Sequence, residues 1–72
     1  MNEKPTIRLV REGRYVAEVD VTLIVTDHEW SPYLSAADVR TLDDVRLALR
    51  EGDLDRAKRL ARVFELTPLA AE

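Results

Sequence analysis

The residues of this chain best suited to chemistry lie around its one histidine. His28 stands between Asp27 and Glu29, and Ser31 follows three positions later. A serine nucleophile needs a histidine base, a third group that orients the base, and hydrogen-bond donors for an oxyanion. Neither of the two glycines lies near this segment, so no glycine-rich turn offers such donors. The sequence therefore predicts a solvated loop histidine rather than a catalytic centre.

A metal site is also unfavourable in this segment. Consecutive residues of an extended chain point to alternate sides, so Asp27, His28 and Glu29 converge poorly on one ion. The chain has no cysteine, which removes thiolate ligands, thiol nucleophiles and disulfides. It also lacks a glycine-rich loop of the kind that cradles phosphates. We therefore expect no enzyme activity and no cofactor.

The element that must position the rest of the chain is a long alternating strand. Between Tyr15 and Thr26 the odd positions are apolar and most even positions are polar. This period of two predicts a strand with one buried and one solvated face. The preceding strand is expected at about 6–11, where Pro5 marks it as an edge or marks its start, and it is long enough for only half of the alternating strand. Because an open strand edge is a template for aggregation, we expect residues 19–25 to pair with or be covered by another element or a second chain.

Glycine sets the turn between these two strands. A three-residue loop of Arg11, Glu12 and Gly13 would end in a left-handed residue, for which glycine is best suited. That loop would place Leu9 opposite Tyr15 and keep one face of the hairpin apolar. A two-residue loop of Glu12 and Gly13 would mix the faces, because a slip of one residue turns a whole strand over. The sequence therefore predicts the three-residue loop.

The hydrophobic period changes from two to that of a helix in the second half of the chain. Ser35 to Asp38 has the pattern of a capping box, and Thr41 to Asp44 offers a second helix start six residues later. These signals predict a short first turn followed by a main helix over about 42–51.

A second helix follows directly. Gly52 stands where a left-handed C-cap is expected, and Asp53 can cap a helix from 54 to about 65 that Pro68 ends. Taken together, the elements predict one small α+β domain over residues 1–72. It consists of a two-stranded antiparallel β-hairpin, a short helical turn and a C-terminal α-helical hairpin packed on the sheet.

Two parts of the sequence resemble known proteins. The run 52–57, with Ala61 and the closing 66–68, is similar to the second half of a tetratricopeptide unit, which implies a helical hairpin. The whole chain, especially 30–35 and 42–46, resembles short uncharacterised bacterial proteins of antitoxin-like size and style. This second resemblance assigns no role to any residue. It implies a small cytoplasmic protein that acts by binding another protein.

Basic side chains in the predicted helices allow a nucleic-acid interpretation. Arg46 and Arg50 are four positions apart, and so are Lys58 and Arg62, so each pair would lie on one helix face and could follow phosphates. Acidic residues are interleaved with them, however, and the chain has a net charge of −3. Such mixed patterns are typical of ordinary surface ion pairs. We therefore expect no nucleic-acid binding, and keep a small regulatory nucleic-acid binder as the alternative.

The remaining candidates point to a protein interface. Trp30 and Tyr33 combine large apolar area with a polar group, which suits them to anchor a partner or to complete a small core. With Val21 and Leu23 of the long strand they form the predicted protein-binding site. The apolar runs are far shorter than the ~20 residues that span a bilayer. We therefore predict a non-enzymatic, cytoplasmic module that binds another protein or a second copy of itself.

Overall fold

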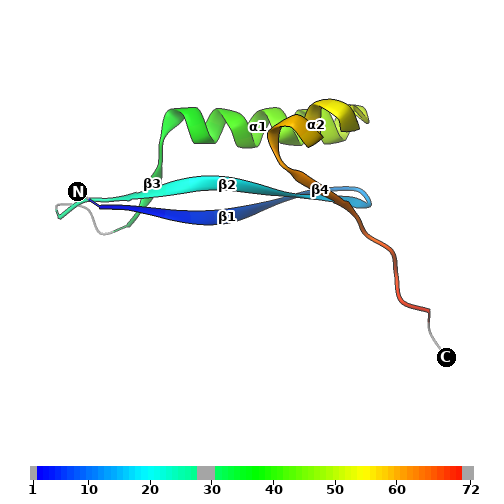
Figure 1. Ribbon diagram of the computed structural model, residues 1–72, viewed down its shortest axis with the longest axis horizontal. Helices are drawn as coiled ribbons and strands as arrows, with labels where there is room; N and C mark the ends of the chain where they lie inside the picture. The colour runs from blue at the N-terminus through cyan, green and yellow to red at the C-terminus, as the bar shows by residue number, and fades with distance from the viewer. Residues whose placement is uncertain (1, 28–30, 71–72) are drawn as a thin grey trace.

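The computed structural model describes residues 2–27 and 31–70. Within these residues the chain forms a four-stranded antiparallel sheet with two helices on one side of it (Figure 1). The elements in chain order are β1 (Asn2–Glu12), β2 (Tyr15–Val25), β3 (Tyr33–Leu34), α1 (Ala36–Glu51), α2 (Leu54–Leu60) and β4 (Arg62–Glu65). The α+β class with an antiparallel sheet and two helices is confirmed, but the sheet is larger than the predicted two-stranded hairpin.

β2 is the internal strand of the sheet. β1 pairs with one edge of β2 along its whole length, from Asn2 opposite Val25 to the hairpin turn. On the other edge, β4 pairs with residues 15–18 and β3 with residues 23–24. The prediction that the far half of β2 is paired or covered is therefore confirmed within one chain. The prediction that the preceding strand is too short is wrong, because β1 has 11 residues.

The hairpin turn is shorter than predicted, and this changes which side chains of β1 face the helices. Gly13 and Arg14 alone connect β1 to β2. Gly13 has a φ of 60°, as a type II′ turn requires at its first central position. Leu9 consequently lies opposite Glu18 rather than opposite the start of β2. The predicted three-residue loop is wrong because Val10, not Leu9, fills the core position on β1.

The core lies between the sheet and the two helices. Alternate residues of β2 point towards the helices and are buried, as the period of two predicted. They meet small or branched side chains from both helices. The buried residues of the core are Val10, Ala17, Val19, Val21, Val45, Ala48, Leu49 and Ala57. All of them are apolar, so this core is stabilised by hydrophobic burial and packing.

α1 is one continuous helix where the sequence predicted a short turn and a later start. The Oγ of Ser35 accepts the N–H of Asp38 at 3.1 Å, as the capping box predicted. The hydroxyl of Thr41 donates to the carbonyl of Ala37 at 3.0 Å, so it is satisfied within the helix. The predicted second start at Thr41 is therefore wrong, and the helix extends over 16 residues.

The second helix is shorter than predicted and is followed by a strand. α2 ends at Leu60, and β4 begins at Arg62. Val63 and Phe64 have side chains that favour strands, and pairing with β2 gives their backbone groups partners. The helical hairpin is therefore present, but the predicted extension of its second helix to residue 65 is wrong.

Glycine and aspartate join the two helices as predicted. Gly52 has a φ of 77°, and its N–H reaches the carbonyls of Ala48 and Leu49. The carboxylate of Asp53 accepts the N–H of Arg56 at 3.1 Å. No atom lies within 4 Å of the position that a Cβ on Gly52 would take. Glycine is therefore needed at this position for its left-handed backbone and not for lack of space.

We predict that Gly52→Ala lowers the free energy of unfolding by about 1 kcal/mol, because alanine is strained in the left-handed region. Gly52→Asn should cost less, since asparagine tolerates this conformation. Urea unfolding followed by circular dichroism measures both values. A larger loss for asparagine than for alanine would contradict this explanation.

Asp38 connects the start of α1 to an open stretch of β2. Its Oδ2 accepts the N–H of Thr22 at 2.9 Å, and the contact is partly buried. Thr22 lies between the residues of β2 that pair with β4 and those that pair with β3. The carboxylate therefore takes the place of a strand neighbour for this backbone donor.

Asp38→Ala should lower the free energy of unfolding by about 1–3 kcal/mol, because a partly buried N–H loses its charged acceptor. Asp43→Ala is the matched control on the same helix. Its side chain is 70% exposed and its carboxylate lies 3.8 Å from Arg46, so its loss should cost less than about 0.5 kcal/mol. Thermal and urea unfolding measure both losses. If Asp38→Ala and Asp43→Ala lower the free energy of unfolding equally, the contact between Asp38 and Thr22 does not stabilise the fold.

Candidate protein-binding surface

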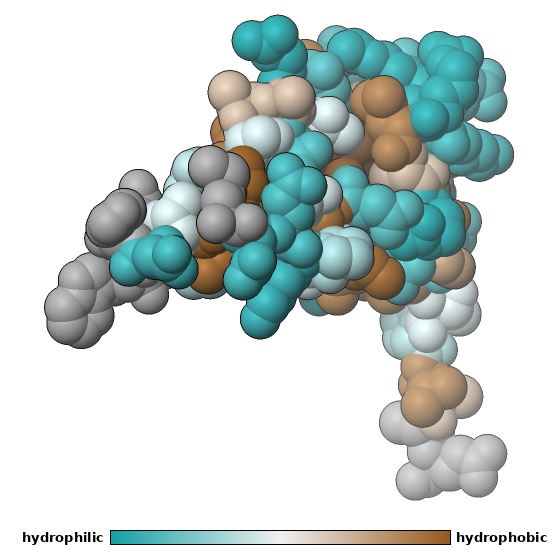
Figure 2. All heavy atoms as spheres, turned by 60° about the vertical axis from the view of Figure 1, so that its left-hand side comes forward, coloured by the Kyte–Doolittle hydropathy of each residue, from teal (hydrophilic) through white to brown (hydrophobic). Residues whose placement is uncertain are grey.

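The sheet face opposite the helices, which we call the open face, carries exposed apolar side chains. Ile7 and Leu9 of β1 are 52% and 66% exposed, and Phe64 of β4 is 48% exposed. They share one face because odd residues of β1 lie opposite even residues of β2, which in turn lie opposite even residues of β4. Figure 2, a side view with the helices above the sheet, shows brown apolar surface between teal hydrophilic side chains. The open face comprises Pro5, Ile7, Leu9, Val16, Glu18, Asp20, Arg62 and Phe64.

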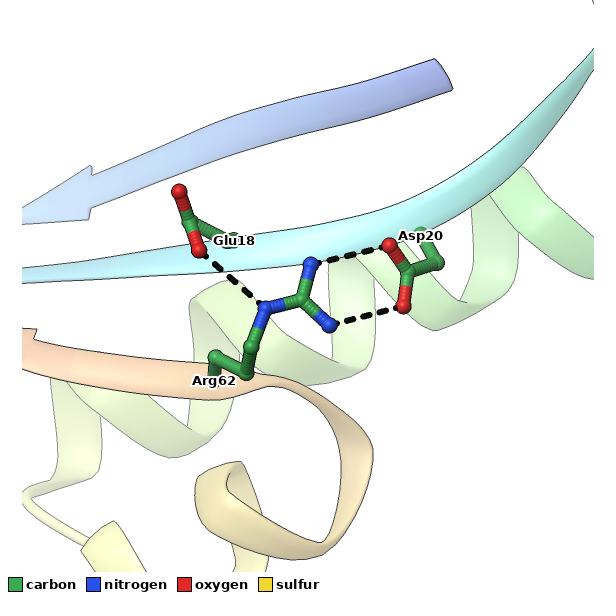
Figure 3. Close-up of polar contacts among 3 residues, drawn as sticks. All are labelled: Glu18, Asp20 and Arg62. Atoms are coloured by element: carbon green, nitrogen blue, oxygen red, sulfur yellow. Dashed lines mark hydrogen bonds and ion pairs between the residues drawn. The ribbon is translucent and has the colours of Figure 1, made fainter. Parts of the chain in front are cut away.

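A charged cluster on the open face connects β4 to β2. The two terminal nitrogens of Arg62 donate to both carboxylate oxygens of Asp20 at 2.9 Å. Its Nε donates to Glu18 at 3.1 Å. Figure 3 shows the guanidinium between the two carboxylates of β2. Bidentate pairing of this kind fixes geometry as well as adding energy, so it holds β4 in register at the edge of the sheet.

The same contacts change how these groups bind protons. The hydrogen bonds from Arg62 lower the pKa of Asp20 below its ordinary value of 3.8, against the opposite effect of desolvation. The hydrogen bonds to Asp20 and then to Glu18 raise the pKa of Arg62. The guanidinium therefore stays charged at every pH at which the carboxylate titrates.

A pH dependence follows from the lowered pKa of Asp20. A carboxylate with a lowered pKa stabilises the fold above about pH 4, and this contribution is lost as the pH falls through the lowered value. We predict that the free energy of unfolding of Asp20→Asn falls less steeply below pH 4 than that of the unsubstituted chain. Asp43→Asn removes an exposed carboxylate outside the Arg62 cluster and is the control for the loss of one charge. Parallel acid titrations of stability in low salt test this, and equal slopes for all three proteins would contradict it.

The outer edge of β1 has backbone groups directed away from the sheet. Thr22 donates its N–H to Asp38 and not to Pro5, its partner on β1. Pairs along an antiparallel ladder alternate between hydrogen-bonded and non-hydrogen-bonded. Every second residue of β1, counted from Pro5, therefore points its N–H and C=O outward. These residues are Glu3, Pro5, Ile7, Leu9 and Arg11.

This outer edge is accessible along its length. Within residues 2–27 and 31–70, no strand pairs with it. Pro5, Thr6, Ile7 and Asp20 line an open hollow of about 570 Å³ beside it. The side chain of Leu9 projects from the same strand onto the open face. The edge thus offers a row of backbone donors and acceptors next to exposed apolar side chains.

The structure separates the residues that were predicted to bind a protein. Val21 is 3% exposed and belongs to the core, so it cannot meet a partner in the folded chain. Leu23 is half-buried opposite Leu34 of β3. Tyr33 is 42% exposed in β3, at the other end of the sheet from the hairpin turn. Trp30 lies outside the described residues. A role in binding for Trp30, Tyr33 and Leu23 stays a prediction.

The basic residues of the nucleic-acid alternative do not form one row. Arg46 lies 3.8 Å from a carboxylate of its own helix, and Arg50 donates to Glu12 of β1 at 2.7 Å. Arg62 belongs to β4 and not to the helix that carries Lys58. The predicted shared helix face of Lys58 and Arg62 is therefore wrong.

The histidine segment gives no further site. His28 and Glu29 lie outside the described residues. In the part of the chain that the structure describes, no three histidine, cysteine or acidic side chains are grouped as metal ligands would be. Neither helix in those residues is both long enough and apolar enough to cross a membrane.

The exposed apolar residues of β1 and β4 were missed as candidates by the sequence reasoning. The predicted three-residue turn places Leu9 on the apolar face of the hairpin, and the predicted helix over 54 to about 65 includes Phe64. A comparison of the chain with protein-family models, curated proteins and solved structures found no match. The open face and the outer edge of β1 are thus the features on which a function has to be argued.

Proposed function

We propose that this chain is a non-enzymatic protein-binding module that adds a strand of its partner to the outer edge of β1. One observation carries the proposal: the 11-residue β1 has an edge without a strand partner within the described residues, beside the exposed side chains of Ile7 and Leu9. Strand addition of this kind gives affinity through backbone hydrogen bonds and specificity through alternate side chains.

The length and side chains of β1 favour pairing of its outer edge with another strand over blocking of that edge. Natural edge strands are often blunted by charged side chains, by proline, by bulges or by short length. β1 is long, and its ladder with β2 has no bulge. Its exposed cations Lys4 and Arg8 project on the helix side, so the open side keeps Ile7 and Leu9 next to each other. Pro5 removes only one outward donor.

This proposal changes the strand that was first expected to self-associate. β2 has neighbours on both edges, so it has no full edge to offer. β1 takes that role. An adaptor or an antitoxin-like protein, which acts by occupying a partner, fits such a module.

The nucleic-acid alternative has less support. Its arginines are engaged by acidic neighbours, and they are distributed over α1 and over the open face. Phosphate binding needs free cations along one surface. We therefore keep the protein-binding function as the conclusion.

Proline at an outward position of β1 tests the proposal. Ile7→Pro removes one outward N–H and leaves the ladder with β2 intact, as Pro5 already does at an equivalent position. Affinity capture with tagged chains, followed by quantitative mass spectrometry, measures how much partner each chain recovers. Ile7→Pro should recover about tenfold less partner than the unsubstituted chain. Ile7→Thr, which keeps the N–H and a β-branched side chain, is the matched control and should retain most of the recovery.

Circular dichroism must first show that both variants fold. A partner that is recovered equally well with Ile7→Pro does not use this edge. If every captured protein behaves in that way, the proposed function is wrong.

A further inference from the structure

We propose that the strand added to β1 is β1 of a second copy, running antiparallel, with Ile7 on the two-fold axis opposite the second copy's Ile7. This inference rests on the proposed function and names its partner. It follows from the register that two identical edges can adopt, combined with the charges along β1.

The direction of the backbone groups restricts the registers. The outward residues of β1 are the odd ones, from Glu3 to Arg11. Two such edges form hydrogen bonds only when odd residues oppose odd residues. A closed dimer also needs a two-fold axis, which passes through the centre of the paired stretch. The axis therefore lies at one residue of β1, and the open faces of the two copies lie on the same side.

The register centred on Ile7 matches charges and length. It uses β1 from end to end. Glu3 lies opposite the second copy's Arg11, and this ion pair occurs twice by symmetry. Pro5 lies opposite Leu9, so the missing proline N–H costs one hydrogen bond on each side while the Leu9 N–H still finds the proline carbonyl. On the helix side, Arg8 lies opposite Thr6.

The neighbouring registers oppose like charges. An axis at Thr6 places Lys4 opposite the second copy's Arg8, and an axis at Arg8 places two copies of that arginine opposite each other. Like charges that face each other across a ladder are destabilising. An axis at Pro5 or Leu9 leaves a large part of β1 without a partner. The Ile7 register alone combines full length with complementary charge.

The paired edges would also join the apolar strips of the two copies. Pro5, Ile7 and Leu9 of each chain lie on the open face next to the strand boundary. In the Ile7 register they form one apolar band across the axis, closed at each end by a Glu3–Arg11 pair. The carboxylates of the Arg62 cluster lie on β2, where Asp20 is opposite Ile7, and Arg62 itself lies one strand further from the axis on β4.

Solution mass gives the first test. Analytical ultracentrifugation of the full chain up to about 1 mM should show a dimer that dissociates on dilution. Amide exchange at high concentration should protect Ile7 and Leu9, which point outward, in addition to Arg8 and Val10, which already bond to β2. A monomer at every concentration overturns the second copy as partner. The proposed function would still be supported in that case if Ile7→Pro recovered another captured protein less well than the unsubstituted chain does.

A charge exchange tests the register. Glu3→Arg and Arg11→Glu each create two like-charge oppositions, so each should weaken dimerisation roughly two- to thirtyfold at low salt. The double variant Glu3→Arg/Arg11→Glu restores the opposition of unlike charges and should recover most of the affinity. Glu51→Arg on α1 is the control for net charge. No recovery in the double variant overturns the Ile7 register.

Disulfide trapping tests the same register independently. The chain has no cysteine, so introduced thiols react without competition. Thr6 and Arg8 oppose each other across the axis as a close, non-hydrogen-bonded pair. A mixture of Thr6→Cys and Arg8→Cys chains with oxidised glutathione should form crosslinked heterodimers. Either variant alone should crosslink poorly, since its own copies are offset by two residues. Efficient trapping of a single variant, or none in the mixture, overturns this arrangement.

Discussion

Burial of one face of β2 is the constraint on which the other elements depend. The odd residues of this strand are apolar without a break, and Ala17, Val19 and Val21 are almost fully covered. Covering them requires α1 and α2 on one side of the sheet. The two edges of β2 then take β1 on one side and β4 and β3 on the other. The position of every strand therefore follows from the side chains of one of them.

Two sets of polar contacts position parts of the sheet that the small apolar core does not position. The core consists of valines, alanines and one leucine, which specify shape weakly because many apolar residues would fit. Arg62 binds Asp20 and Glu18 and so fixes the register of a strand only four residues long. Asp38 binds the backbone of Thr22, where β2 would otherwise lack a neighbour. Directional bonds thus set positions that apolar packing leaves open.

The sequence predicted the elements whose signals are local, and it missed those decided by distant contacts. The alternation of β2, the Ser35 capping box and the left-handed Gly52 depend on neighbouring residues, and all are present. The turn predicted at Gly13 is wrong because Leu9 and Val10 are adjacent and both apolar, so the local pattern fits either one facing the core. The sequence predicts a helix at β4 because nothing local reveals that Arg62 meets carboxylates some forty residues earlier. For the candidate site, Pro5 marks β1 as an edge or marks its start, and the structure has β1 at the edge, but the predicted turn places Leu9 on the wrong face.

A chain of this size has limited means of protecting the edge that this topology creates. Each further strand covers one edge of a sheet and exposes another. The last open edge is removed only when the sheet closes into a barrel or when a partner pairs with that edge along its length. β2 has strand neighbours within the chain on both edges, and among the described residues the 11-residue β1 presents a longer unpaired edge than the short strands β3 and β4. Binding there would act only on the folded chain, because the unfolded chain has no strand to present. Association at β1 would therefore add to the stability of a small core by mass action, and folding and recognition would depend on the same backbone groups.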